Sequence, residues 1–224
     1  MSKPIRAGED LLSGVAPLGA GRGRPRLLVR DEALAVAMKV INEEGLASLT
    51  LRRLAKELGV GSATVHTTFG GKEQLLQALA DTVFAELPDP DTLQADDPFH
   101  ALVDYIVAVH RMLVEHPAIA QLTVIRRMNN RALFRAHETI FELLGELDVH
   151  GQDAYDAYDA LTNYVFGFSL NRISRQEFDR HETIAALPAE QFPALKQIAP
   201  LFEQRAPEEQ LRANLHRLLA AYLP

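Results

Sequence analysis

The chain has 224 residues, of which 47% are hydrophobic and 24% are charged, and this composition is typical of a globular protein. It contains no cysteine, which excludes a disulfide framework, cysteine zinc sites and thiol nucleophiles. No apolar run is long enough for a transmembrane helix, and the first residues lack the apolar core of a signal peptide. We therefore expect a soluble, cytoplasmic protein.

The net charge of −7 is unevenly distributed along the chain. Residues 1–72 carry eleven Lys/Arg and seven Asp/Glu, whereas residues 73–224 carry twelve Lys/Arg and twenty-three Asp/Glu. The front of the chain is therefore basic and the rest is acidic. This asymmetry indicates that one end of the molecule meets a polyanion and the other does not.

The first residues differ in pattern from those that follow. Residues 1–29 contain scattered glycines and prolines without periodicity, which favours a flexible arm, and residues 1–25 form its basic part. From Asp31 onward, apolar residues recur at the i, i+3, i+4, i+7 spacing of an amphipathic helix. Gly45 predicts the end of this first helix.

Three further helices are predicted before residue 88. The second begins after the N-cap candidate Thr50 and ends at Gly59. Ser62 is predicted to cap a short third helix over residues 63–68, and a longer helix covers residues 72–87. Short helices joined by a tight, glycine-containing turn are typical of a helix-turn-helix.

Helical patterns also fill the chain beyond the proline-rich, acidic stretch at residues 88–98. They cover residues 99–115, 117–128, 131–147, 151–175 and about 207–222, with only short helices between 183 and 207, where prolines interrupt the pattern. No stretch shows the period of a strand. The predicted fold is all-α, with a helical head over residues 26–87 and a larger C-terminal domain over residues 88–224.

The strongest functional signal is the segment TLRRLAKELGVGSATVHTTFGGKEQLL at residues 50–76. Its Thr-x-Arg opening, Gly-Val turn, helix of small residues, Phe and Lys-Glu pair resemble the DNA-binding signature of the tetracycline-repressor (TetR) family. The preceding ALAVAMKVINEEGLASLT is similar to that family's first helix. The resemblance implies a helix-turn-helix motif at about residues 49–68 whose second helix enters a DNA major groove.

The resemblance and the side-chain chemistry together predict the DNA contacts. Small side chains on the short helix allow a close approach to base edges, and the predicted contacts there are Ser62, Ala63, Thr64, His66 and Thr67. Thr50, Arg52 and Lys72 are predicted to bind phosphates, Lys72 at a helix N-terminus that attracts anions. The family usually has tyrosine at the position of His66, and histidine can also donate to a phosphate.

The sequence Arg22-Gly23-Arg24-Pro25 matches the core of an AT-hook, in which extended arginines enter a narrow A·T minor groove. The alternative is a basic arm that contacts phosphates nonspecifically. In both cases we expect the arm to contact DNA, and Arg22, Arg24 and Arg26 are the predicted residues.

The C-terminal part also resembles the TetR family, specifically the effector domain of tetracycline-repressor-type proteins. The resemblance rests on EHPAIAQL (115–122), LDVHGQDAYDAYDALTNYVFGFSL (147–170) and QFPAL (191–195). It implies a homodimer in which helices near 151–175 and 207–222 form a four-helix bundle with a second subunit. It also implies a pocket for a small-molecule effector.

Fourteen of the fifteen aromatic residues follow residue 72, which suits either a pocket or an ordinary core. The predicted pocket residues are Phe84, Tyr105, Met112, Phe134, Phe141, Tyr158, Asn163, Phe166 and Phe168. For each of them, core packing is the alternative. Thr123 and Asn171 stand where the drug repressors carry a magnesium-binding histidine and an acidic residue, so we expect an effector other than magnesium-tetracycline.

Sequence motifs of enzymes are missing. The segment GAGRG at residues 19–23 follows no predicted strand and lacks the lysine of a phosphate-binding loop. Neither a zinc-protease motif nor a nucleophile elbow is present, and the eight histidines lack metal-ligand spacing. We therefore expect no enzymatic activity, no metal site and no cofactor.

These observations predict a homodimeric transcriptional repressor that a small-molecule effector releases from double-stranded, palindromic operator DNA. A ligand that tightens DNA binding would instead indicate a corepressor. The alternative from another class is a nonspecific, architectural DNA-binding protein without an effector. The large acidic domain argues against it, because a packaging protein has little need of one.

Overall fold

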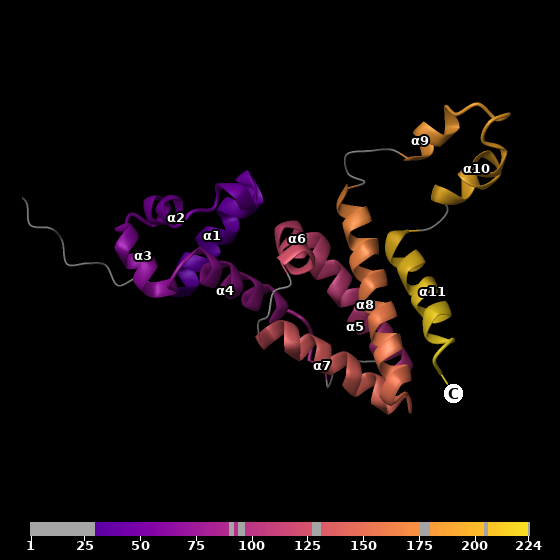
Figure 1. The fold of residues 1–224 in the computed structure, drawn as a ribbon, viewed down its shortest axis with the longest axis horizontal. Coiled ribbons are helices and arrows are strands. Elements are labelled where there is room, and N and C mark those ends of the chain that lie inside the picture. Colours follow the sequence, from indigo (N-terminus) through magenta and orange to yellow (C-terminus); the bar gives the residue numbers. More distant parts are fainter. Residues whose placement is uncertain are drawn as a thin grey trace, which may run out of the picture.

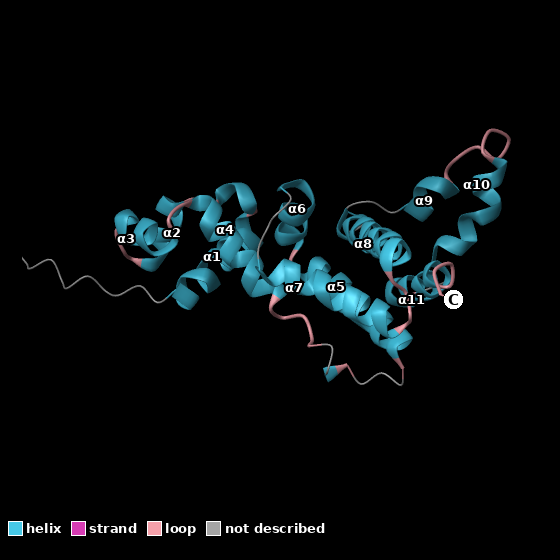
Figure 2. Cartoon of the chain, turned by 60° about the horizontal axis from the view of Figure 1, so that its bottom comes forward, coloured by secondary structure: helices cyan, strands magenta, loops and turns pink. Residues whose placement is uncertain are grey.

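The computed structural model describes residues 30–89, 92–93, 97–126, 131–174, 180–203 and 206–223. Within these ranges every regular element is a helix, which confirms the all-α prediction (Figure 2). None of the described helices combines the length and apolar character that a membrane span requires. The predicted DNA contacts Arg22, Arg24 and Arg26 lie outside the described residues.

The helices form a head and a larger domain (Figure 1). The head contains α1 (Arg30–Glu44), the 3-10 turn η1 (Leu46–Ser48), α2 (Leu51–Leu58), α3 (Ser62–Phe69) and α4 (Lys72–Phe84). The larger domain contains α5 (Pro98–Glu115), α6 (Pro117–Arg126), α7 (Arg131–Glu146), α8 (Gly151–Ser174), α9 (Arg180–Ala185), α10 (Pro193–Ile198), the 3-10 turn η4 (Ala199–Glu203) and α11 (Pro207–Leu219).

Two helix boundaries in the head differ from the prediction. Ser62 is the first residue of α3 and not its N-cap, because extended Gly61 holds that position and accepts the first backbone hydrogen bonds with its carbonyl. Helix α4 ends at Phe84 and not near Leu87. Its last turn tightens, since the N–H of Leu87 donates to the carbonyl of Phe84, and Pro88 follows, which disfavours continuation of a helix.

The head has a small apolar core. Leu34, Ala37 and Ile41 of α1 are buried, as the helical spacing of these residues predicts. They pack in one cluster with Leu54 of α2 and Val65 of α3, both fully buried. Packing on this core orients α2 and α3 relative to α1 and α4.

The larger domain is built around α5, which packs against α6, α7, α8 and α11. Helices α8 and α11 lie side by side, whereas α9 and α10 project away from the domain (Figures 1 and 2). Ion pairs between Arg111 and Glu208 and between Arg212 and Asp104 fasten α11 to α5. The side chains of Arg111 and Glu208 make two hydrogen bonds, of 3.0 and 2.6 Å.

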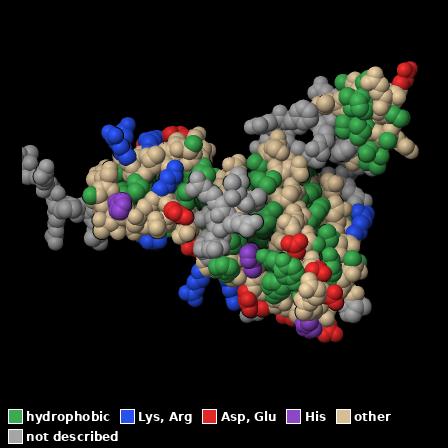
Figure 3. Space-filling model, viewed as in Figure 1, with side chains coloured by type: hydrophobic (Ala, Val, Ile, Leu, Met, Phe, Trp, Pro, Cys, Tyr) green, Lys and Arg blue, Asp and Glu red, His purple; other side chains and the backbone are tan. Residues whose placement is uncertain are grey.

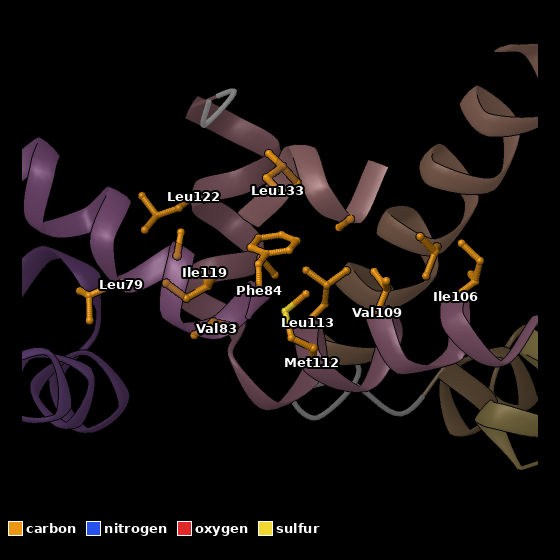
Figure 4. Close-up of a cluster of buried hydrophobic side chains, with 14 of the residues drawn as sticks. Leu79, Val83, Phe84, Ile106, Val109, Met112, Leu113, Ile119, Leu122 and Leu133 are labelled. Carbon is orange, nitrogen blue, oxygen red and sulfur yellow. The ribbon is translucent and has the colours of Figure 1, made fainter. Parts of the chain in front are cut away.

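Helix α4 joins the two parts through a continuous apolar contact. Leu79, Val83 and Phe84 on α4 lie with Ile119 of α6 and Leu113 of α5 in one buried cluster (Figure 4). Because interiors are close-packed, α4 cannot shift without disturbing its neighbours in the larger domain. A change in the larger domain can therefore reach the head through α4.

Candidate nucleic-acid interface and ligand cavity

The turn between α2 and α3 has the geometry that the sequence predicts. The Thr50 hydroxyl accepts a hydrogen bond from the backbone N–H of Arg53 at 3.0 Å and caps α2. At the other end, Gly59 adopts the left-handed conformation (φ 65°, ψ 29°), which turns the chain toward α3. Buried Leu54 and Val65 then fix the crossing of the two helices.

Helix α3 presents a surface of small polar side chains. Ser62, Ala63, His66 and Thr67 are exposed, and Thr64 is half-buried. The Thr67 hydroxyl donates to the carbonyl of Ala63 at 2.9 Å, so its oxygen remains free to accept and its methyl group to make apolar contacts. Such a surface can approach base edges closely, as a helix in a major groove must.

Two consecutive arginines on α2 have different environments. Arg53 pairs with Glu44 of α1 and with Glu57 one turn further along α2, and these carboxylates raise the pKa of its guanidinium. Arg52 is exposed and has no partner among the described residues. Arg53 therefore braces the head, while Arg52 is available to a phosphate.

Further cations lie on the head. Lys72 is exposed at the start of α4, where Gly71 supplies no side-chain cap, so the first backbone N–H groups of α4 are open to an anion. Sequence reasoning did not single out Arg30, whose guanidinium lies 5.1 Å from the ring centroid of Phe69, or exposed Lys56. The only feature of the sequence that indicates a role for these two residues is the excess of Lys and Arg in the first 72 residues. That excess does not reveal where each charge lies in the fold.

Charge is less sharply separated in the described structure than in the sequence. In Figure 3, Lys and Arg side chains are spread over the visible face of the head with acidic side chains among them, whereas Asp and Glu side chains gather on the lower part of the larger domain. Residues 30–72 carry six Lys/Arg and five Asp/Glu, so most of the basic excess of the first 72 residues comes from residues 1–29. The attraction of a polyanion to the head therefore depends on individual exposed cations and on the arm.

A cavity of about 600 Å³ lies between α4, α5 and α7, beside the chain that follows α4. Its walls are formed by Asp81, Phe84, Ala85, Leu87, Pro88, Asp89, Tyr105, Arg131, Ala132, Arg135, Ala136 and Thr139. Phe84 and Tyr105 are among the predicted pocket residues. The charged residues and Thr139 were not predicted, because only the fold brings residues 81–89 and 131–139 together.

Four other predicted pocket residues do not line this cavity. Met112 is buried in the core beside Leu113 (Figure 4). Phe134 is 56% exposed, and Phe141 and Tyr158 stack on each other with ring centroids 4.7 Å apart. Phe134, Phe141 and Tyr158 form part of an aromatic surface between α7 and α8.

The remaining three predicted residues lie on α8: exposed Asn163 and half-buried Phe166 and Phe168. The ring of Phe168 meets buried His110 of α5 edge-on, with centroids 5.2 Å apart. The Ser169 hydroxyl donates to the carbonyl of Val165, so it accepts from Nδ1–H of His110 at 2.8 Å. Burial lowers the pKa of His110 and favours the neutral imidazole.

Asp81 links the cavity to the helix that carries the head. It lies on α4, and its carboxylate accepts a hydrogen bond from the backbone N–H of Ala132 at 3.2 Å. This bond satisfies one of the open N–H groups at the start of α7. Since Asp81 and Ala132 both line the cavity, a ligand there would contact the junction between α4 and α7.

The two positions compared with the magnesium site of the drug repressors make hydrogen bonds within their own helices. Thr123 donates to the carbonyl of Ile119 and Asn171 to the carbonyl of Gly167, both at 2.9 Å. Among the described residues, no group of three His, Asp or Glu is arranged to hold a metal ion. Neither side chain is an ionic oxygen or imidazole ligand of the kind that a divalent cation would need.

Two family models match the chain and cover both of its parts. The model described as "Bacterial regulatory proteins, tetR family" matches residues 33–79. The model described as "Tetracyclin repressor-like, C-terminal domain" matches residues 87–220. The first match ends within α4, and the second begins shortly after that helix ends.

Curated relatives carry related descriptions. The chain is 25% identical over 163 residues to the HTH-type transcriptional repressor DrrR1 of Streptomyces coeruleorubidus, a match that covers 71% of this chain and 59% of that protein. It is 24% identical over 146 residues to the class D tetracycline repressor of Escherichia coli, covering 65% of this chain and 66% of the relative. The chain thus spans less than two thirds of the length of both relatives.

Solved structures share the fold. The TetR-family protein ActR of Streptomyces coelicolor in complex with actinorhodin has a TM-score of 0.72 at 24% identity, covering 87% of this chain and 95% of ActR. The complex of ActR with (S)-DNPA gives the same TM-score over 88% of this chain and 98% of ActR. The helical arrangement described above is therefore an arrangement also found by experiment.

Proposed function

The chain belongs to the TetR family of bacterial regulatory proteins, and on this premise we propose that it is a homodimeric, sequence-specific transcriptional repressor that a small-molecule effector releases from palindromic operator DNA. The observation that carries the proposal is the exposed surface of α3, which has exposed Arg52 on one flank and exposed Lys72 on the other. Small side chains on the helix and exposed cations beside it suit a major groove bordered by phosphates.

In the proposed complex, α3 reads bases while the surrounding groups bind the DNA backbone. Thr64 and Thr67 would contact base edges, and Thr50, Arg52 and Lys72 would contact phosphates. Two-fold symmetry would place the two α3 helices roughly 34–36 Å apart, in successive major grooves of a palindrome. The basic arm that includes Arg22, Arg24 and Arg26 would add contacts in the adjacent minor groove.

The dimer would form through α8 and α11, which lie side by side. A side chain at Gly167 of α8 would meet no atom within 4 Å, so packing within this chain does not require a glycine there. An exposed glycine on a long helix suits close approach by a second helix. This supports a four-helix bundle with the partner subunit.

The cavity between α4 and α7 is the proposed effector site. Its volume of about 600 Å³ lies within the range of small-molecule sites, roughly 300–1,000 Å³. An effector there would favour one position of α4 and so a head spacing that no longer matches the operator. Linkage then requires DNA to weaken effector binding by the same factor, with a coupling of typically about 1–3 kcal/mol.

The remaining parts of the proposal concern chemistry and location. We expect an effector other than magnesium-tetracycline, because Thr123 and Asn171 are unsuited to the metal. The protein would act without enzymatic activity, in the cytoplasm, where its operator is located. ActR, whose fold this chain shares, has been solved with small molecules bound, which supports a ligand-responsive role.

The test is a binding selection from fragmented genomic DNA at near-physiological salt, followed by fluorescence anisotropy against random DNA. Enrichment of a palindrome, bound at least about a thousandfold more tightly than random DNA, is the expected result. Weak, salt-sensitive binding to every fragment would overturn the proposal in favour of an architectural protein. Binding that appears only after a small molecule is added would show a corepressor mechanism instead.

A further inference from the structure

The cavity between α4, α5 and α7 is lined by both charged and apolar groups. Arg131 and Arg135 lie one turn apart at the start of α7, and both line the cavity. Phe84 and Leu87, from α4 and the turn after it, supply apolar surface, and Ala136 extends it on α7. A ligand that matches both kinds of group has an apolar body and a polar or charged end.

The arginines are the charged groups that remain available to such a ligand. Arg131 is exposed and has no ion-pair partner among the described residues. Arg135 has a carboxylate oxygen of Glu142 at 3.7 Å, which is too long for a strong hydrogen bond. An oxygen atom of a ligand can therefore bind either guanidinium without breaking a close ion pair.

The two carboxylates of the cavity are already engaged. Asp81 accepts from the backbone N–H of Ala132 at 3.2 Å, and Asp89 also has an interaction partner. The N-terminus of α7 contributes a further partial positive charge beside Arg131. The groups of the cavity that are open to a ligand are therefore the two guanidinium groups, and these bind an anion.

Two hydroxyl groups lie on the same wall as Arg135. Burial raises the pKa of Tyr105, so its phenol stays protonated and can donate a hydrogen bond. The Thr139 hydroxyl donates to the carbonyl of Arg135 at 3.1 Å, and the side chains of Tyr105 and Thr139 are hydrogen-bonded to each other. The two hydroxyl groups therefore add a polar surface to the cavity beside Arg135.

We propose that the cavity binds an amphipathic organic anion, with its carboxylate or sulfonate on Arg131 and Arg135 and its apolar rings against Phe84, Leu87 and Ala136. The inference rests on the proposed function of this cavity as the effector site, and it specifies the chemical class of the effector. A guanidinium offers paired N–H donors that match the two oxygens of a carboxylate.

The test compares two dyes of nearly the same shape. 8-Anilinonaphthalene-1-sulfonate carries the anionic group, and N-phenyl-1-naphthylamine has the same rings without it. Binding of each dye to the full chain is followed by fluorescence titration in the wild type, in Arg131→Gln and in Arg135→Gln. Lys39→Gln is the matched control, because it removes one positive charge from an exposed side chain of α1 outside the cavity.

The place of binding is established separately. The chain contains no tryptophan, so Leu87→Trp introduces a single donor for energy transfer at the wall of the cavity. Ala85→Trp, at an exposed position of the same wall, serves if Leu87→Trp melts at a lower temperature than the wild type. Quenching of the tryptophan emission by the bound dye is expected for a dye in the cavity.

We expect each arginine substitution to weaken sulfonate binding about tenfold, to leave the neutral dye within about twofold, and Lys39→Gln to change neither. Equal losses for both dyes, no loss for the sulfonate, or no energy transfer would each overturn the inference.

Operator binding by the same variants separates the claim about the ligand class from the claim about the proposed function. Specific DNA binding with dye binding that is independent of the arginines defeats only the ligand class, whereas absence of specific DNA binding defeats the proposed function.

Discussion

The head and the larger domain build their binding surfaces from the sequence in different ways. The candidate DNA-binding surface comes from one short segment, from Thr50 to Lys72, with α2 and α3 joined by a turn at Gly59. The cavity is formed by residues from 81 to 139, on three helices that meet only in the folded chain. A major groove accepts a single helix, so a local motif suffices to bind it, whereas a ligand cavity depends on how distant helices pack.

The largest effect that tests this comparison is expected from Leu54→Ala in the head. Leu54 is fully buried, and truncation of such a leucine costs about 2–5 kcal/mol of unfolding free energy. We expect loss of DNA binding together with an early thermal transition of the head, measured by circular dichroism. Dye binding in the cavity should persist below the main transition, since the helices that pack most closely on α2, which carries Leu54, are α1 and α3 and not α5 or α7. Simultaneous loss of both would show that head and larger domain unfold as one unit.

The next effect separates two neighbouring arginines. Arg52→Ala should weaken operator and random DNA alike by roughly tenfold and reduce the slope of log affinity against log salt by about one per contact, because a phosphate contact is lost. Its thermal stability should equal that of the wild type. Fluorescence anisotropy across a salt series provides the measurement.

Arg53→Ala is the matched variant. Its ion pairs with Glu44 and Glu57 are partly exposed to solvent, so their loss should lower the free energy of unfolding only slightly. The salt slope of DNA binding should stay unchanged. A reduced salt slope for Arg53→Ala, or none for Arg52→Ala, would reverse the roles assigned to them.

A smaller effect is expected where the two regions meet. Asp81→Ala removes the acceptor for the backbone N–H of Ala132, and loss of such a cap costs about 1 kcal/mol. Asp81→Asn retains an oxygen acceptor and should cost less. Urea denaturation monitored at 222 nm would measure both variants. Equal destabilisation by the two would indicate that the negative charge matters and not the hydrogen bond.

The same comparison explains what could be predicted from the sequence. Helical periodicity, Thr50 and Gly59 were sufficient to predict α1, α2 and the turn, because caps and apolar spacing are local signals. The prediction of Ser62 as N-cap was wrong because the extended backbone of Gly61 takes that position without help from a side chain. The capping preferences of residue types identify both Ser62 and Gly61 as candidates for the N-cap of α3. The packing of α3 on α2 then determines which residue occupies the position.

The residues of the cavity could be predicted only in part from local sequence patterns. Aromatic type led to Phe84 and Tyr105, which line it, but also to Phe134, which is largely exposed in the single chain. Arg131 and Arg135 gave no signal, since two arginines one turn apart normally lie on a solvated helix face. Only the approach of α4 to α7 makes them part of a site, and that approach depends on contacts more than forty residues apart in sequence.

The smallest predicted effect lies deep in the larger domain, at the buried contact between His110 and Ser169. Because burial lowers the pKa of His110, the unfolded chain takes up a proton before the folded chain does when the pH falls. The stabilising effect of keeping His110 neutral is therefore complete above about pH 6.5, the usual histidine value, and decreases as the pH falls toward the lowered value. His110→Gln can still donate to Ser169 and does not titrate.

We therefore expect the wild type to lose more stability than His110→Gln between pH 7 and pH 5.5, measured by urea denaturation. Half-buried His137, whose pKa burial also lowers, is unchanged in both proteins and cancels in the difference. The charges of Glu208, Arg172 and Arg111 act on His110 less than burial does, so the sign of the difference should survive added salt. An identical pH dependence in the two proteins would mean that the folded larger domain accepts a charged imidazole at this position, and that the contact between α5 and α8 is open to water there.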